Sequence, residues 1–258
     1  STRLRKNTMV GSIITSLIFS LATSPSIPLS IDNGATAQGK AIARTELAVA
    51  YYGDKQYGNA LTELKSAIEH DSNYAPAQNM LGVVNMELKR NDEAERAFRA
   101  ALSIDKENPD NNNNYGWFLC QTNRIQDSYS YFEKAATNPS YKSPSRPLFN
   151  AGKCALLEND EQKAMAFFVE ALKLAPNATA VLMEIAKMHY KQGRYDDVIQ
   201  TVDQISEIEG PVAAALWLGL QAERKKGNNA EVESYGLQIQ KKFPKSPEAA
   251  MWKARAFQ

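Results

Sequence analysis

The sequence is poor in the residues that build most active sites and metal centres. Its 258 residues contain only two cysteines and two histidines, and His70 and His189 lie far apart in the chain. The ligands for a closed zinc site are therefore barely available. The chain also contains no glycine-rich phosphate loop, no HExxH or CxxC motif and no GxSxG nucleophile turn. We therefore expect no enzymatic activity, no cofactor and no metal site.

The chain also lacks an excess of charge of either sign. Thirty Lys and Arg residues stand against 29 Asp and Glu residues, which gives a formal net charge of +1. Binding to nucleic acid needs a clustered basic surface, whereas the only basic runs here are short, at residues 3–6 and 224–226. A nucleic-acid partner is excluded on this basis. Because 43% of the residues are hydrophobic, the chain has enough apolar material for a packed core.

Residues 1–38 differ in composition from the rest of the chain. A basic start is followed by a charge-free apolar stretch at residues 9–22 and then by a segment rich in Ser, Pro, Ala and Gly. This pattern is typical of an export signal, and the apolar stretch is shorter than the roughly 20 residues of a membrane-spanning helix. Small residues predict cleavage after Ala22 or Ala37, with an uncleaved anchor as the alternative. We expect an exported protein in an oxidising compartment.

From residue 39 onward the chain repeats itself. The repeat places a small residue in a first helix, and then a small residue, a large apolar residue and a second small residue in a second helix. The starting residues of successive repeats lie 34, 34, 36 and 34 positions apart, which is the tetratricopeptide period. The five sets are Ala48/Ala60/Leu64/Ala67, Gly82/Ala94/Phe98/Ala101, Gly116/Ser128/Phe132/Ala135, Gly152/Ala164/Phe168/Ala171 and, more weakly, Ala186/Val198/Val202/Ile205.

The repeat has a physical cause in helix packing. Two antiparallel helices that approach closely need a small side chain at the contact and a large one opposite, so Gly82 is expected to pack against Phe98. One hairpin cannot bury its apolar stripe alone, but stacked hairpins can. We therefore predict an all-α, right-handed solenoid over residues 39–258. Its hairpins are expected near residues 41–74, 75–108, 109–144, 145–178, 179–211 and 212–246, with a capping helix at 247–258.

The connections between helices carry their own signals. A longer linker at residues 138–147 accounts for the 36-residue interval between the third and fourth repeats. It is expected to form a loop or local hinge. The turns inside the hairpins are marked by glycine, or by asparagine, which tolerates left-handed backbone angles. These turn residues are Gly53, Gly193, Gly227, Asn91, Asn123 and Asn159.

The two cysteines lie at similar heights in the first helices of adjacent repeats. Cys120 and Cys154 are separated in the chain by one tetratricopeptide period. Helix axes separated by about 8 to 10 Å can bring such a pair near the Cα separation of about 5.5 Å that a disulfide requires. We predict a Cys120–Cys154 disulfide, with two free buried thiols as the alternative. The bond would contribute about 3 to 4 kcal/mol by restricting the unfolded chain.

The first helices also supply a hypothesis for binding. In a right-handed stack of this kind, positions five, nine and twelve of each first helix face the concave side. Several of the selected side chains are large and apolar, which suits a groove that binds an extended or helical peptide, although some of them could be shared core between repeats. Asn79 and Asn113 occupy the same position and could bond a peptide backbone. The predicted groove consists of Val49, Tyr52, Asn79, Val83, Met86, Asn113, Trp117, Phe149, Lys153, Leu156, Met183, Lys187 and Tyr190.

Two local stretches resemble a known family. They are the segment NNYGWFLC at residues 113–120 and the segment SYGLQIQKKFPKS at residues 234–246. Together with six hairpins after a signal-like start, they resemble the PilW/PilF family of type IV pilus biogenesis proteins, the pilotin-type tetratricopeptide repeat proteins. Cys120 and Cys154 also look like the paired cysteines of neisserial members.

The resemblance implies a periplasmic adaptor at the outer membrane. Such an adaptor helps the pilus secretin to reach the membrane and to form its multimer, so the expected partner is the secretin or another pilus assembly protein. Family members are typically lipoproteins, but no cysteine stands directly after the apolar stretch here to take the lipid. Membrane contact is therefore expected through the partner or through the uncleaved N-terminal segment. The alternatives are a general exported scaffold unrelated to pili, and an enzyme or regulatory subunit with an unrecognised site.

Overall fold

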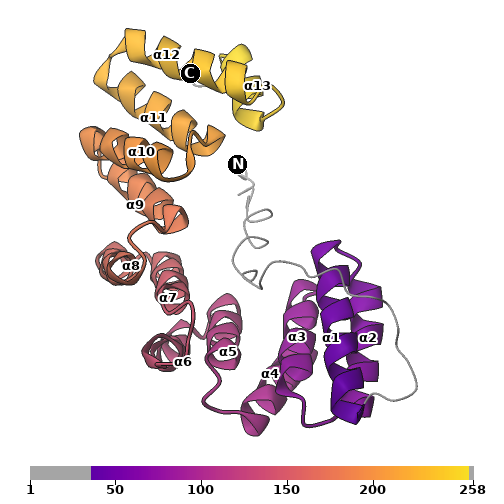
Figure 1. The fold of residues 1–258 in the computed structure, drawn as a ribbon. Coiled ribbons are helices and arrows are strands. Elements are labelled where there is room, and N and C mark those ends of the chain that lie inside the picture. Colours follow the sequence, from indigo (N-terminus) through magenta and orange to yellow (C-terminus); the bar gives the residue numbers. More distant parts are fainter. Residues whose placement is uncertain (1–35, 256–258) are drawn as a thin grey trace, which may run out of the picture. The chain divides into compact units, whose positions relative to one another are not determined.

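The computed structural model describes residues 36–255, and every regular element within them is a helix (Figure 1). Consecutive helices pair as hairpins, from α1 and α2 to α11 and α12, and α13 follows alone. This arrangement confirms the predicted all-α fold of about six helical hairpins with an added C-terminal helix. The helices are α1 Ala37–Gly53, α2 Tyr57–His70, α3 Ala75–Glu87, α4 Asn91–Ile104, α5 Pro109–Gln121, α6 Ile125–Thr137, α7 Ser145–Leu157, α8 Glu161–Leu174, α9 Thr179–Lys191, α10 Tyr195–Glu209, α11 Ala213–Lys226, α12 Asn229–Lys242 and α13 Pro247–Lys253.

The predicted export segment and linker, residues 1–38, lie almost entirely outside the described residues. Helix α1 nevertheless begins at Ala37, two residues before the expected start of the solenoid at residue 39. The hydroxyl of Thr36 accepts a hydrogen bond from the backbone N–H of Gly39 at 3.0 Å, which caps the helix and fixes its start. Cleavage after Ala22 concerns residues that are not described, whereas cleavage after Ala37 would remove this cap.

The described chain divides into two compact units, and the first ends at Ala77. Its core is the predicted packing set of the first hairpin, in which Ala48 and Leu64 are fully buried. An ion pair between Arg44 on α1 and Glu63 on α2, 2.7 Å long, links the two helices beside this core. The first hairpin is therefore held by small buried side chains and one half-buried ion pair.

The second unit begins at Gln78 and repeats one glycine-to-aromatic contact. A methyl group on Gly82 or Gly152 would lie closer to the facing ring than real side chains approach, and one on Gly116 would make an unusually tight contact, so these positions favour glycine. This contact confirms the packing role predicted for Gly82 and Phe98. The closest distances from such a methyl carbon are 2.6 Å for Gly82 against Phe98, 3.0 Å for Gly116 against Phe132 and 2.4 Å for Gly152 against Phe168.

The same contact continues beyond the five repeats that the sequence pattern identified. A methyl group on Gly219 would lie 2.9 Å from the Tyr235 ring, and one on Gly236 would lie 2.2 Å from the Trp252 ring. In both pairs the aromatic residue follows its glycine at the same distance along the chain as Phe98 follows Gly82. Trp252 therefore docks α13 onto α12, which is how the short last helix covers the end of the unit.

A left-handed backbone conformation recurs once in the turn of each hairpin. Asparagine and glycine hold this position in the last four hairpins, as predicted. The predictions for Gly53 and Asn91 are wrong, because Gly53 is the last residue of α1 and Asn91 is the first of α4. Lysine takes their place in the first two turns, at a cost of about 1 to 2 kcal/mol relative to glycine. The left-handed residues are Lys55, Lys89, Asn123, Asn159, Gly193 and Gly227.

The long linker between α6 and α7 is fastened to the start of α5. The guanidinium of Arg146 pairs with the carboxylate of Asp110 and also donates to the hydroxyl of Tyr141. The Tyr141 hydroxyl in turn donates to Asp110 at 3.1 Å. Burial, more than the neighbouring charges, raises the pKa of Tyr141 to about 12. Of the two predicted states of this linker, the structure shows a loop held in place rather than a free hinge.

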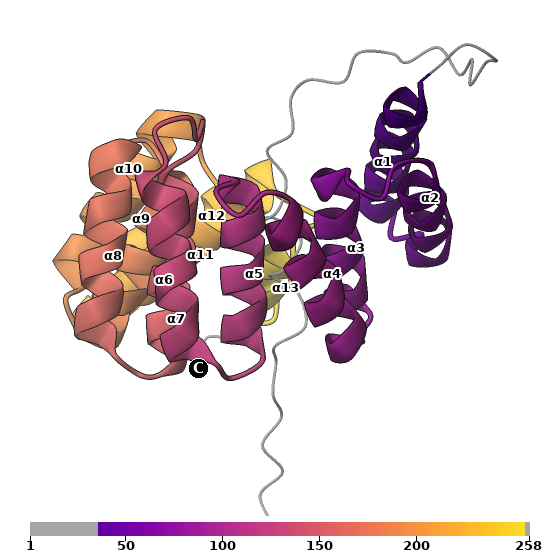
Figure 2. The ribbon, with the colours of Figure 1, turned by 90° about the horizontal axis from the view of Figure 1, so that it is seen from below.

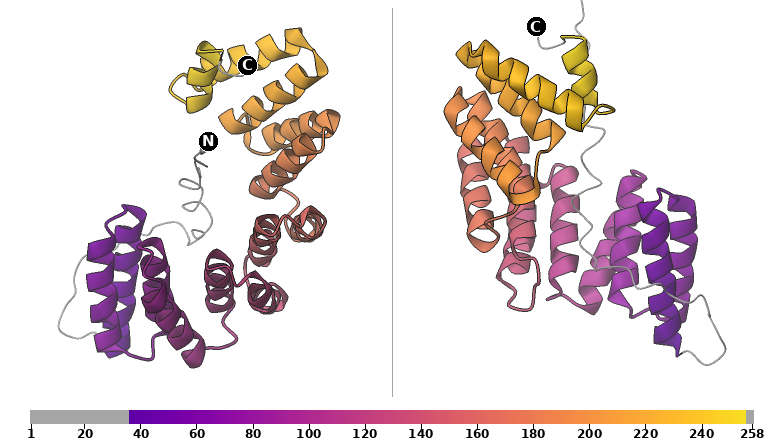
Figure 3. Two further views of the ribbon diagram at one scale, coloured as in Figure 1. Left: turned by 180° about the vertical axis from the view of Figure 1, so that it is seen from behind. Right: turned by 45° about the horizontal axis from the view of Figure 1, so that its top comes forward.

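In the second unit the helices form two layers. Figures 1 and 3 show the first helices α5, α7, α9 and α11 along one side and their partners α6, α8, α10 and α12 along the other. Figure 2, seen from below, shows α5 to α8 with roughly aligned axes. We call the surface formed by positions five, nine and twelve of the first helices in this unit the first-helix face.

Candidate partner-binding face

The predicted groove residues differ widely in burial. In the first unit Val49 is half-buried and Tyr52 is buried. In the second unit Lys187 is exposed, and five other predicted residues are half-buried: Asn79, Lys153, Leu156, Met183 and Tyr190. The remaining five are buried: Val83 at 1% exposure, Asn113 at 2%, Phe149 at 6%, Met86 at 7% and Trp117 at 8%. Their burial agrees with the alternative that some of the predicted residues are shared core between repeats.

A chain of asparagine side chains crosses the first helices α3, α5 and α7. Asn150 Nδ2 donates to Asn113 Oδ1 at 2.9 Å, Asn113 Nδ2 donates to Asn114 Oδ1 at 3.1 Å, and Asn114 Nδ2 donates to Asn79 Oδ1 at 3.4 Å. Asn79 and Asn113, which were predicted to bond a peptide backbone, are thus joined to each other through Asn114. The amide of buried Asn113 is engaged within the protein on both its oxygen and its nitrogen.

Farther along the same face, a buried carboxylate lies between two lysines. Glu184 on α9 is 7% exposed. Its Oε2 lies 3.3 Å from Lys153 Nζ on α7, and its Oε1 accepts from Lys187 Nζ one turn along α9 at 2.8 Å. A buried carboxylate is stable only with such partners. One negative and two positive charges leave this cluster with a net charge of +1.

The sequence analysis missed the residues that complete these contacts. Asn114, Asn150 and Glu184 all occupy position six of their first helices. They are spaced along the chain by the same intervals as the repeats to which they belong. That spacing is the signal that could have revealed them, because residues at one repeat position line up across a stack of hairpins. Their side chains reach the neighbouring first helix, so position six belongs to the first-helix face as much as position five does.

The last part of the face combines aromatic and cationic side chains. The Tyr190 and Tyr195 rings meet at 5.6 Å between centroids. Burial raises the pKa of Tyr190, with a further increase from Tyr195, while the positive charge of nearby Arg224 opposes the rise. Half-buried Trp217, which precedes Gly219 by two residues as Glu184 precedes Ala186, extends the same face onto α11. Trp217 and Arg224 were not among the predicted residues.

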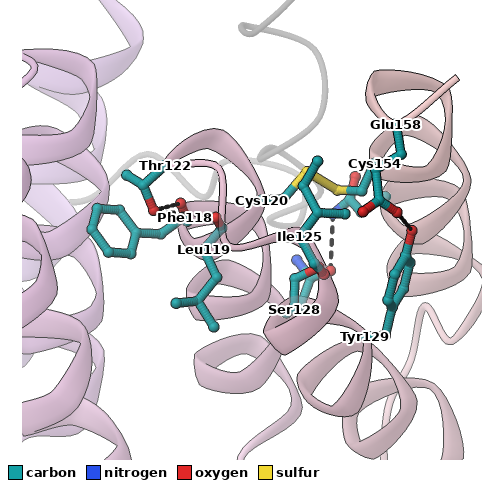
Figure 4. Close-up of a disulfide and its surroundings, with 11 residues drawn as sticks. Phe118, Leu119, Cys120, Thr122, Ile125, Ser128, Tyr129, Cys154 and Glu158 are labelled. Atoms are coloured by element: carbon teal, nitrogen blue, oxygen red, sulfur yellow. Dashed lines mark hydrogen bonds between the residues drawn. A yellow bond between two sulfur atoms is a disulfide. The ribbon is translucent and has the colours of Figure 1, made fainter.

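The predicted disulfide is present. It joins Cys120 near the end of α5 to Cys154 on α7, with the two Cα atoms 5.9 Å apart, so both cysteines of the chain are bonded (Figure 4). Both are buried, at 1% and 0% exposure. The bond therefore fixes the spacing of two adjacent first helices, and with it the spacing of the side chains that they contribute to the face.

A charged network holds α4 and α5 to Arg124, the residue before α6. Arg124 donates from both terminal nitrogens to the two oxygens of Glu95, each at 3.0 Å, and the Tyr115 hydroxyl donates to Glu95 at 3.1 Å. The hydrogen bond from Arg124, with support from Arg99, lowers the pKa of Glu95 to about 2. This network is a structural clamp between two repeats.

Residues 36–255 contain neither a cluster of metal ligands nor a membrane-spanning helix. No three His, Cys, Asp or Glu side chains in this range gather into a group suited to a metal ion. No helix in the same range combines the length and the apolar character needed to cross a bilayer.

Comparisons with known proteins agree with the repeat architecture. Residues 51–110 and 155–223 match the tetratricopeptide repeat family. The chain is 32% identical over 219 residues to the type IV pilus assembly protein PilF of Pseudomonas aeruginosa, a match that covers 83% of this chain and 86% of PilF.

Two solved structures share the fold of this chain. The crystal structure of PilW, a type IV pilus biogenesis factor, is 30% identical with a TM-score of 0.69, over 81% of this chain and 96% of PilW. The structure of Pseudomonas aeruginosa PilF is 28% identical with a TM-score of 0.68, over 85% of this chain and 99% of PilF. The chain therefore belongs to the PilF and PilW family of tetratricopeptide repeat proteins, which are non-catalytic scaffolds of type IV pilus biogenesis.

Proposed function

We propose that the protein is a periplasmic adaptor that binds the pilus secretin and assists its localisation or multimerisation at the outer membrane. The observation that carries this proposal is the 32% identity to PilF over 86% of that protein. Binding a secretin subunit before assembly would stabilise it by mass action, without any chemical step. A scaffold whose first helices present side chains to a partner is suited to that task.

The proposal includes a route to the membrane that needs no lipid. Both cysteines of the chain are joined in the disulfide, so neither is available to take a lipid. Attachment would then come through the N-terminal apolar segment or through the secretin itself. N-terminal sequencing of the exported protein distinguishes the two, because attachment by the segment requires a protein that still contains residues 9–22.

Deletion of the gene tests the proposal. We expect the outer-membrane fraction of the deletion strain to lose most of its secretin multimers on a denaturing gel, and a plasmid copy to restore them. Loss of surface pili with unchanged multimers would favour another pilus assembly protein as the partner. Unchanged multimers together with unchanged pili would contradict the proposed function and return the protein to the class of general envelope scaffolds.

A further inference from the structure

The first-helix face changes in character along the second unit, and its part on α7, α9 and α11 is the more accessible one. Lys153 and Lys187 keep 20% and 47% of their side-chain surface exposed. Leu156, Met183 and Tyr190 beside them are half-buried rather than buried. A partner can therefore reach both ammonium groups and an adjoining apolar surface.

The charges on this part of the face are unbalanced. Each lysine ammonium carries three N–H donors, and Glu184 takes one contact from each of the two lysines. The cluster keeps a net positive charge, and Arg224 adds another positive charge close to Tyr190. An approaching carboxylate would gain charge-assisted hydrogen bonds here, whereas an approaching ammonium would be repelled.

Helix α10, the outer-layer partner of α9, presents acidic side chains where the first-helix face presents basic ones. The outer surface of α10 forms a shallow hollow lined by Asp203 and Glu207, by apolar and amide side chains, and by Asp196, which is paired with Lys226 at 2.8 Å. Burial and the nearby charge of Glu207 raise the pKa of Asp203. An acidic partner would be repelled from this outer surface and drawn to the first-helix face, so charge alone distinguishes the two sides of the repeat.

We propose that the first-helix face of α7, α9 and α11 binds a peptide segment in which an aspartate or glutamate lies next to an apolar side chain. The carboxylate would lie against Lys153 and Lys187, and the apolar side chain against Leu156, Met183 and Tyr190. Glu184 is a positioning residue, because its carboxylate contacts both ammonium groups and bridges them. This inference rests on the proposed function, since it names the chemistry of the segment that a pilus partner would supply.

The test uses the full chain and short labelled peptides that tile the secretin and the other pilus assembly proteins of the same organism. Fluorescence polarisation identifies the peptides that bind. We expect the binders to be acidic and apolar, and their affinity to fall as sodium chloride rises from low to physiological concentration. Binders that are basic or uncharged, or no binder at all, would overturn the inference.

Charge reversal then locates the site. Lys187→Glu is expected to weaken the best binder about tenfold or more. Lys173→Glu is a matched control, because Lys173 also pairs with a glutamate three residues earlier but belongs to α8, in the outer layer. We expect it to change the affinity less than twofold. Equal affinities for the wild type and Lys187→Glu would contradict the proposed site.

Two checks keep this test separate from folding and from the proposed function. Lys187→Met removes the charge without adding a carboxylate near Glu184. Because Lys153 still pairs with Glu184, the variant should weaken binding while its thermal midpoint stays close to that of the wild type. The deletion experiment asks only whether secretin multimers depend on the protein. If secretin multimers depend on the protein but peptide binding does not respond to the Lys187 substitutions, the proposed function stands and the proposed site is wrong.

Discussion

Helices α5 and α9 occupy the same place in their repeats but bury their residues differently. Both are 13 residues long. In α5 nine residues are buried, including three consecutive asparagines and Trp117, whereas six are buried in α9. At repeat position nine, Trp117 is 8% exposed, while the equivalent Lys187 keeps 47% of its side-chain surface exposed.

The asparagines of α5 show why this difference arises. Asn111 Nδ2 donates to the carbonyls of Ala101 and Asp105, and Asn112 Nδ2 donates to those of Lys106 and Asn108. They close the end of α4 and the turn that follows, so their polarity serves the fold. In α9, Lys187 pairs with buried Glu184 and keeps nearly half of its own side-chain surface exposed. Position in the repeat therefore sets the direction of a side chain, while its neighbours decide whether that side chain is core or surface.

The largest expected effect is a loss of stability when a buried side chain of α5 is removed. Trp117→Ala should lower the free energy of unfolding by about 3 to 5 kcal/mol, because it removes a large buried side chain and leaves a cavity. Urea denaturation followed by circular dichroism measures the change. Leu157→Ala, at a side chain that is 57% exposed, is the control and should cost less than about 0.5 kcal/mol. Equal costs for the two variants would contradict the assigned burial.

Removing the disulfide between α5 and α7 should have the next largest effect. Replacing both Cys120 and Cys154 by alanine is expected to cost about 3 to 4 kcal/mol, because the bond closes a loop one repeat long in the unfolded chain. The wild type should lose a similar amount when it is fully reduced, and the double variant should not respond to reductant. Two titratable thiols in denatured, non-reduced wild-type protein would show that the bond does not form.

The glycine contacts predict a pair of opposite effects. Gly152→Ala should destabilise the protein by about 1 to 3 kcal/mol, because its methyl group would press on the Phe168 ring at 2.4 Å. Gly58→Ala in α2 meets no atom within 4 Å, and it should stabilise the protein by about 0.5 to 1 kcal/mol through helix propensity. Thermal melts of both variants measure the two changes. Destabilisation of similar size at both sites would contradict the close approach of α7 and α8.

The smallest effect concerns the pH dependence of stability. Because Arg124 lowers the pKa of Glu95 from 4.5 to about 2, the pair stabilises the fold fully above pH 4.5, and this contribution is lost as the pH falls toward 2. We expect a contribution on the order of 1 kcal/mol, since the carboxylate is partly exposed and screened by solvent. Glu95→Gln should flatten this part of the curve of unfolding free energy against pH. An unchanged curve between pH 4.5 and 2 would show that the clamp contributes nothing.

The fold could be predicted from the sequence because the residues that specify each hairpin lie close together in the chain. Gly82 and Phe98 lie in one hairpin, and their contact follows from helix geometry alone. The disulfide was predictable for a related reason, since the repeat places Cys120 and Cys154 on adjacent first helices. The left-handed turn at Lys89 was missed because residue preference favoured Asn91, although counting one repeat length back from Asn123 identifies it.

The candidate site was only partly readable, because it depends on contacts between repeats. The repeat position placed Lys153 and Lys187 on one face. It could not show that Glu184 bridges them, or that Asn113 is buried and engaged with Asn150. Those facts depend on how closely two first helices pack, which no single repeat encodes.

Site-specific photocrosslinking tests the central claim, that the first-helix face recognises a pilus assembly protein. A photoreactive phenylalanine analogue would replace Tyr190 on α9 or, as the control, Val169 on α8, which is 43% exposed. After irradiation of cells and capture of the protein, we expect a pilus assembly protein to be crosslinked from position 190 and not from position 169. Crosslinking of that partner from position 169 alone would contradict the account.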